Sequence, residues 1–231
     1  MKVCVITPYY EESDAIISRC MGSVRKQTYP NWIHMLVSDG YHVDERTLGK
    51  IEHMILPRSH KDAGATPRAL GAISAFSRGF DAVAFLDVDN TFSEGHLEQM
   101  VAICKRSDAD VVAARRNICS LTGEVLYTDT FESNGNDFCD TNCMFLTRNT
   151  LPLMTNWITQ KDIMLFGDRY FWNKLKENKV KIEINAIPTV NYYSKWAVHY
   201  QNSGKIPPDD SVWISQDSEG KLVHRRHGDN K

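Results

Sequence analysis

The stretch Asp81–Asn90, DAVAFLDVDN, decides the fold of this chain. Its five apolar residues, 82–86, form a short continuous run that is typical of a strand buried on both faces, as in a parallel sheet. Two carboxylates follow directly, Asp87 and Asp89, and residues i and i+2 of an extended backbone point to the same side. Because parallel α/β sheets bind ligands beyond the carboxyl ends of their strands, this pair is a candidate site.

Two interpretations of Asp87 and Asp89 follow from their spacing. Close carboxylates repel each other, so a hard cation such as Mg²⁺ or Mn²⁺ would relieve the repulsion and leave positions open for phosphate groups. Alternatively, the pair belongs to a turn or a helix N-cap, where Asp and Asn are common. The spacing alone favours neither interpretation.

The composition is that of an ordinary globular protein. The 231 residues are 42% hydrophobic and 24% charged, which suits one large domain with a full core. The net charge of −2 gives no overall basic character, so nucleic acid is not an expected partner. No apolar run approaches the roughly 18 residues of a membrane span, and residues 2–7 are too short for the apolar part of a signal peptide. We therefore expect no transmembrane segment.

The six cysteines indicate a reducing compartment. Cys139 and Cys143 are the only near pair, and no second pair follows at a zinc-type spacing. Neither a disulfide framework nor a zinc site is therefore expected. The simplest interpretation is a cytoplasmic protein.

Working outward from the central strand, the first ninety residues alternate between strands and helices. Strands are expected at 2–7, 32–37 and 51–56, before the strand that ends at 86. This order predicts an α/β fold with a mostly parallel central sheet and helices on both faces. Three of the strands end in polar loops, and parallel strands would bring these loops to one edge of the sheet.

The ends of these strands and helices are also predicted. Pro8 is expected to end the first strand, because it cannot donate to the ladder. A helix is expected over about 13–26, and another is expected to start at Thr66, with its hydroxyl as the cap and Pro67 at the first helical position.

The second half is less regular. Helices are expected from Ser93 and over 147–156 and 166–176, and strands over 109–114, 143–146 and 180–184. Residues 115–142 are expected to form a hairpin or a long loop. Residues 212–214 and 221–224 are expected to pair across a turn, and the chain is polar from about 201.

Five ordered stretches carry more specific information: VITPYYEES (5–13), SVRKQTYPNW (23–32), LVSDG (36–40), GATPRALG (64–71) and FLDVDN (85–90). Together they resemble the inverting glycosyltransferases of family 2, which have the GT-A fold. The resemblance is dense over residues 3–115 and thin afterwards. It favours the metal interpretation of Asp87 and Asp89. The departures are Glu11, Ser38 and Ala69, which stand where the family usually has Asn, an acid and Asn.

The resemblance implies a nucleotide-diphosphate sugar as the donor, with UDP as the expected nucleotide. It implies that Pro8 contacts the base through its backbone, that Tyr10 stacks on the base, and that Glu12 accepts from the ribose. Asp39 would accept from an imide N–H of uracil; alternatively it forms a turn with Gly40. Tyr9 is expected to pack in the core.

The resemblance also implies roles at the phosphates. Arg68 would bind phosphate or brace the base; the alternative is a surface ion pair. Asp89 would bind Mn²⁺ or Mg²⁺ directly, and Asp87 would contact the ribose, or the metal through water. His199 would be a third metal ligand, or else a structural histidine.

An inverting transfer needs a carboxylate base, and the resemblance places it near the start of a late helix. Asp168 is the candidate, with Gly167 where the family often has Glu, and Asp162 is held in reserve. The helix N-terminus is expected to keep Asp168 ionised. The alternative is an ordinary acidic residue in the first turn of a helix.

The resemblance implies one GT-A domain with two halves. Residues 1–90 would bind the nucleotide sugar, and residues 91–231 would bind an acceptor that is a saccharide, a lipid-linked molecule or a protein. Two other functions remain open. A nucleotidyltransferase would need a Gly-rich phosphate loop after the first strand, where PYYEES is acidic and has no Gly. A non-catalytic relative would bind the nucleotide sugar without transfer.

Overall fold

A mixed α/β architecture is confirmed by the computed structural model, which describes residues 1–41, 51–158, 166–216 and 222–226. The strands in chain order are β1 (Val3–Tyr9), β2 (Trp32–Ser38), β3 (Glu52–Ile55), β4 (Ala82–Phe85), β5 (Thr91–Phe92), β6 (Val111–Cys119), β7 (Val125–Asp129), β8 (Met144–Thr147), β9 (Ile182–Tyr193), β10 (Val212–Gln216) and β11 (Leu222–Arg226). The α-helices are α1 (Asp14–Arg25), α3 (Ala65–Ser77), α4 (His96–Ser107), α5 (Gly167–Glu177) and α6 (Ala197–Asn202), and the 3₁₀-helices are η1 (Thr141–Cys143) and η2 (Arg148–Trp157).

One sheet runs through both halves of the chain, in the order β3-β2-β1-β4-β8-β6-β9-β5, with β7 paired to β6. Neighbouring strands are parallel from β3 to β4 and again between β6 and β9. Strand β8 is antiparallel to both of its neighbours, β4 and β6. The expected hairpins are present: β6 pairs with β7, and β10 pairs with β11 in a separate small sheet.

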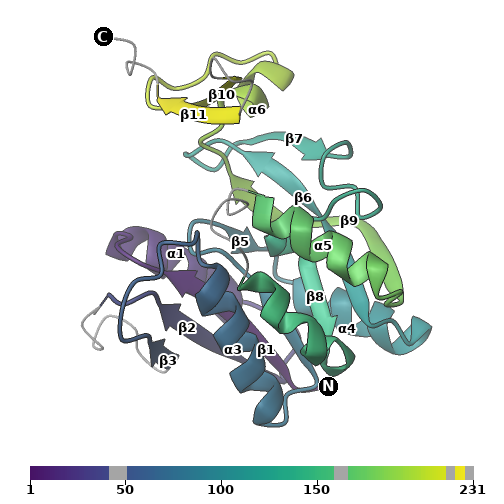
Figure 1. Ribbon diagram of the computed structural model, residues 1–231. Helices are drawn as coiled ribbons and strands as arrows, with labels where there is room; N and C mark the ends of the chain where they lie inside the picture. The colour runs from purple at the N-terminus through teal and green to yellow at the C-terminus, as the bar shows by residue number, and fades with distance from the viewer. Residues whose placement is uncertain (42–50, 159–165, 217–221, 227–231) are drawn as a thin grey trace.

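Helices cover both faces of the large sheet. In Figure 1, α3 and α5 lie on the near face, whereas α1 and α4 lie behind the sheet. The C-terminal hairpin of β10 and β11 lies at the top of the view, beside α6. No helix within the described parts of the chain is long and apolar enough to cross a membrane.

The central strand has the predicted character. All four residues of β4 and the following Leu86 are buried, so the apolar run is covered on both faces. Strand β1 beside it is also buried along its whole length. Helix α1 contributes Ile17, Cys20, Met21 and Val24 to the same core, at the spacing of one helical face.

Two predicted boundaries are wrong. Strand β1 does not end at Pro8 but continues to Tyr9, whose carbonyl accepts the N–H of Asp39 at 2.9 Å, so Pro8 removes only its own donor. Helix α3 begins at Ala65 rather than Thr66, after Gly64 in the left-handed region. The N-cap position is Gly64, and the Thr66 hydroxyl does not cap the helix but donates, with the Thr66 N–H, to the carboxylate of Asp62, at 2.5 and 2.9 Å.

Gly71 allows α3 to lie close to the sheet. A Cβ atom at this position would come within 2.8 Å of Ile6 Cγ2 and 3.1 Å of Val37 Cγ2, on β1 and β2. Helix α3 therefore packs directly against β1 and β2.

The second half differs from expectation mainly in its longer strands. The strand was expected to end at Ala114, with a hairpin or a long loop over 115–142, but β6 continues through Arg115 and Arg116 to Cys119. Strand β9 likewise extends to Tyr193 and stays paired with β6. Ser93 does not cap α4, which begins at His96 after Gly95.

Candidate active site

The first pocket lies where β1, β2 and β4 end, and it has a volume of about 400 Å³. Parallel pairing brings the three polar loops to this edge, as predicted. The pocket contains all seven residues that were expected to bind the donor or its metal from the first half: Pro8, Tyr10, Glu12, Asp39, Arg68, Asp87 and Asp89. The other lining residues are Tyr9, Ser59, Lys61, Asp62, Ala63, Gly64 and Val88.

Two tyrosines at the end of β1 have different environments. Tyr10 is 40% exposed, with its ring 5.9 Å from that of Tyr41, and its N–H donates to Glu12 at 2.7 Å. Tyr9 is buried and hydrogen-bonds His53, as expected for a packed residue. The exposed ring of Tyr10 is therefore the one that can stack on a planar ligand.

Asp39 is buried and fixes the loop at residues 59–61. Its carboxylate accepts from the Ser59 hydroxyl at 3.0 Å, the His60 ring at 2.8 Å and the Lys61 N–H at 3.3 Å. Burial acts to raise its pKa, but these hydrogen bonds outweigh burial and lower the pKa. Asp39 therefore stays ionised and shapes one wall of the pocket.

Arg68 and Asp87 form an ion pair at the floor of the first pocket. Arg68 is buried, donating from Nη2 to Asp87 at 2.5 Å and from Nη1 to the Ala63 carbonyl at 2.8 Å. It is therefore not a surface ion pair. On its other side, Asp87 accepts from the side-chain amide of Asn142 at 3.1 Å.

Asp89 has the perturbed acidity of a functional carboxylate. Burial, and then the charge of Asp87, raise its pKa to about 6. Its loop is held by Arg19, which donates to the Asp89 carbonyl at 2.7 Å. The charge of Lys195 acts to lower this pKa but does not outweigh burial and Asp87.

Asp87 and Asp89 are the candidate ligands for a metal ion. Among the described residues, no group of three or more His, Cys, Asp or Glu side chains is arranged to hold a metal. Asp87 and Asp89 nevertheless offer oxygen ligands on one pocket wall, and their repulsion would be relieved by a cation. This donor set fits Mg²⁺ or Mn²⁺, which keep several ligand positions for water and phosphate.

The second pocket has a volume of about 420 Å³ and contains Asp168 and His199. Its lining combines charged residues with an apolar rim: Arg116, Glu132, Phe138, Asp140, Phe166, Asp168, Arg169, Tyr192, Trp196, Val198, His199 and Ile214. The predicted residues thus divide between two pockets. The reserve base, Asp162, lies outside the described residues.

Asp168 lies in the first turn of α5, where its carboxylate accepts the Arg169 N–H at 2.8 Å. The expectation that the helix N-terminus keeps it ionised is wrong. Burial, and then the charge of Asp140, raise its pKa to about 7, because the helix terminus supplies less than these two effects remove. A carboxylate with this pKa is suited to accept a proton near neutral pH.

His199 is buried in the second pocket rather than beside Asp87 and Asp89. Its Nδ1 hydrogen-bonds the Ser194 hydroxyl at 2.6 Å, and its Nε2 lies 3.6 Å from Glu132. Both ring nitrogens therefore have protein partners, which favours the structural interpretation.

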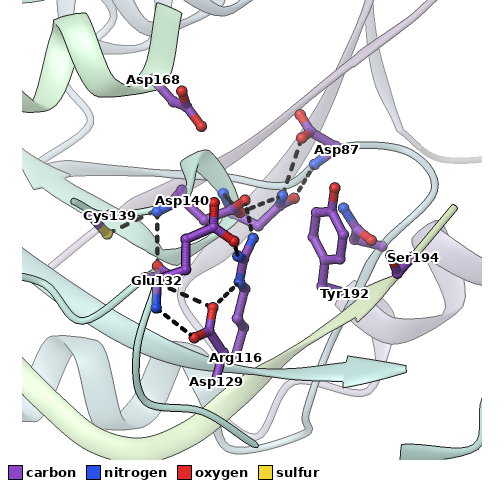
Figure 2. A network of polar contacts seen from close by, with 12 residues as sticks. Asp87, Arg116, Asp129, Glu132, Cys139, Asp140, Asp168, Tyr192 and Ser194 are labelled. Carbon is purple, nitrogen blue, oxygen red and sulfur yellow. Dashed lines mark hydrogen bonds and ion pairs between the residues drawn. The ribbon is translucent and has the colours of Figure 1, made fainter. Parts of the chain in front are cut away.

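Arg116 is the centre of a buried polar network that sequence reasoning missed (Figure 2). Its guanidinium donates to Asp129 at 2.9 Å, to Asp140 at 2.6 Å and to Glu132 at 3.0 Å. These contacts raise the pKa of Arg116 and keep it charged despite burial. All three acids come from residues 115–142, which had been expected to form a hairpin or a long loop.

Asn142 joins this network to the first pocket. Its side-chain amide donates to Asp140 at 2.8 Å as well as to Asp87. Figure 2 shows Asp87 at one end of the connected residues, and Asp168 pointing toward them from α5. No local signal in the sequence marks Asn142, because its partners come from separate segments.

Comparisons with known proteins agree with the fold. The model of the family described as glycosyl transferase family 2 matches residues 4–148. The curated proteins contain no match. Solved structures of S. aureus TarS are similar: residues 1–349 in complex with UDP (TM-score 0.66, 16% identity, 88% of this chain and 63% of that chain) and in complex with UDP-GlcNAc (TM-score 0.62, 16% identity, 84% and 59%). This chain thus spans less than two thirds of those structures, and at these identities the likeness shows the fold alone.

Proposed function

We propose, from the premise that this chain belongs to glycosyl transferase family 2, that it transfers a sugar from a UDP-sugar to an acceptor hydroxyl with inversion. The observation that carries the proposal is the pair of adjoining pockets, one with the seven donor-binding candidates and one with Asp168. The TarS structures with UDP and UDP-GlcNAc support the choice of nucleotide.

The first pocket would hold the donor. Tyr10 would stack on the base, Glu12 would accept from the ribose, and Asp39 would accept from the base while holding its own loop. Asp89 and Asp87 would hold Mg²⁺ or Mn²⁺, and Arg68 would fix Asp87 beside it. When bound, the cation would neutralise the charge that develops on the diphosphate leaving group.

The second pocket would hold the acceptor. As the acceptor oxygen bonds to the anomeric carbon, its proton passes to the Asp168 carboxylate. The bond from that carbon to the diphosphate oxygen breaks with its electron pair, so UDP leaves from the opposite face and the configuration inverts. Because Asp168 must be ionised, kcat/KM should rise with pH to a plateau above about 7.

The test compares two site variants with a matched control. UDP release from UDP-sugars, with Mn²⁺ and a panel of acceptors, measures transfer, and thermal shift with UDP and Mn²⁺ measures donor binding. Asp168→Asn should keep the thermal shift and lose turnover by about 10²–10⁴-fold. Asp89→Ala should lose both. Asp14→Asn, the same change in the exposed first turn of α1, should resemble wild type.

Three outcomes would contradict the proposal. Equal turnover in Asp168→Asn and wild type would remove the base. Loss of nucleotide binding in Asp168→Asn would move that residue to the donor site. Nucleotide binding by wild type without transfer to any acceptor would favour a non-catalytic relative.

A further inference from the structure

Asn142 occupies the boundary between the two pockets and is fully buried. Its Oδ1 accepts the backbone N–H of Asp87 at 2.6 Å, and its Nδ2 donates to the Asp87 carboxylate at 3.1 Å. The same Nδ2 donates to Asp140 at 2.8 Å. The amide thus uses its acceptor and both of its donor hydrogens on two acids from different parts of the chain.

Asp140 faces the second pocket from the start of η1. One carboxylate oxygen accepts from the side chain and the N–H of Asn142, at 2.8 and 2.9 Å, and the other accepts from Arg116 at 2.6 Å. Both oxygens are therefore fixed, and the residue is buried. Asp140 and Asp168 both line the second pocket, and the negative charge of Asp140 acts to raise the pKa of Asp168.

Other charged groups also face Asp168. Arg169 on α5 and Arg68 on α3 act to lower its pKa, whereas Asp140 acts to raise it. The second pocket also contains Arg116, Glu132 and His199. Arg116 is paired with Glu132 and with Asp140 itself, and Glu132 lies 3.6 Å from His199 Nε2. Burial is the first cause of the raised pKa of Asp168, and Asp140 is the charged group that adds to it.

We propose that Asn142 is a positioning residue of the transfer reaction. One amide holds Asp87 toward the donor and Asp140 toward Asp168, so the donor site and the surroundings of the base are built on the same group. This inference rests on the proposed function. An apolar residue would leave both acids without their amide partner, and an acid would place three carboxylates together.

The competing explanation is a purely structural role, in which Asn142 only stabilises η1. Replacement of a purely structural residue would lower the melting temperature. It would leave the pH profile of kcat/KM and the donor KM unchanged. Asn185 is a matched control, because it is also buried and its side chain bonds Gln99 at 2.9 Å and the Ile187 N–H at 3.1 Å, outside both pockets.

The test measures pH profiles of kcat/KM and the donor KM for Asn142→Ala, Asp140→Asn and Asn185→Ala. Asp140→Asn should move the acidic limb from about pH 7 to lower pH, because the charge that raises the pKa of Asp168 is gone. Asn142→Ala should move it in the same direction by a smaller amount and should raise the donor KM about tenfold. The double variant should have the acidic limb of Asp140→Asn alone, since Asn142 acts there through Asp140.

Asn185→Ala should lower the melting temperature and leave both readouts at wild-type values. The proposal is overturned if Asn142→Ala behaves like Asn185→Ala, or if Asp140→Asn keeps the wild-type limb. Should Asn142→Ala fail to fold, Asn142→Ser replaces it, with the same expected outcomes. Failure of the function proposed above is distinct, because wild type itself would then transfer no sugar.

Discussion

Asp168 shows how burial can reverse the effect of a helix terminus. A carboxylate in the first turn of a helix is stabilised in its ionised form by about 0.3–1 kcal/mol. Burial and Asp140 act against ionisation and win, since the pKa rises to about 7. Ionised Asp168 thus lowers the free energy of unfolding, which is consistent with a catalytic role.

This effect predicts a stability gain in Asp168→Asn. The ordinary pKa of 3.8 applies to the unfolded chain, and the folded value is about 7. The contribution of Asp168 to stability is therefore fully present below about pH 4 and is lost as the pH rises through 7. After allowance for partial exposure, the variant should be about 1–2 kcal/mol more stable than wild type at pH 8.5, and less so at pH 5. Denaturant unfolding at both pH values checks this; a gain that shrinks with pH would contradict it.

Arg116 shows that the ion-pair partners of a residue cannot be predicted from its neighbours in the sequence. The strand was expected to end at Ala114, with a hairpin or a long loop over the polar residues 115–142. The strand continues because Asp129, Glu132 and Asp140 neutralise Arg116, and these acids come from a later segment. Local pattern gives no measure of such long-range pairing.

At the scale of elements, the loops after β1, β2 and β4 could be predicted, because parallel pairing fixes which strand ends meet. The partners of β8 could not be predicted. An apolar run such as Met144–Leu146 indicates burial but carries no information on the direction of its neighbours. The second pocket is lined by residues from β6, the loop before η1, α5, β9 and α6, which are far apart in the chain. Its set of residues could therefore not be predicted, although Asp168 was.

Two helices give a matched pair of glycine predictions. Gly22 in α1 has open space where a Cβ would go, so Gly22→Ala should gain about 0.5–1 kcal/mol of stability from helix propensity. Gly71 in α3 has Ile6 Cγ2 at 2.8 Å, and this β-branched side chain in a buried strand cannot move away easily. Gly71→Ala should therefore lose about 1–2 kcal/mol despite the same propensity gain. Denaturant unfolding of both variants decides, and a gain in both would refute the close packing of α3.

For the whole molecule, the buried state of all six cysteines predicts slow thiol chemistry. Each is at most 6% exposed, and burial raises the pKa of every one of these thiols. A thiol reagent should therefore modify almost none of them in the native protein and all six in guanidinium chloride. Rapid modification of one thiol without loss of near-UV circular dichroism would contradict this.

The antiparallel strand β8 also affects the stage of synthesis at which the large sheet can form. It pairs Phe145 with Ala84 of β4 and with Val112 of β6, so it closes the sheet between segments synthesised long before it. Until β8 arrives, β4 presents an unpaired apolar edge, which is a template for aggregation. A fragment ending near residue 90 should therefore be poorly soluble. During synthesis, the chain would depend on protection by chaperones until residue 147 has emerged.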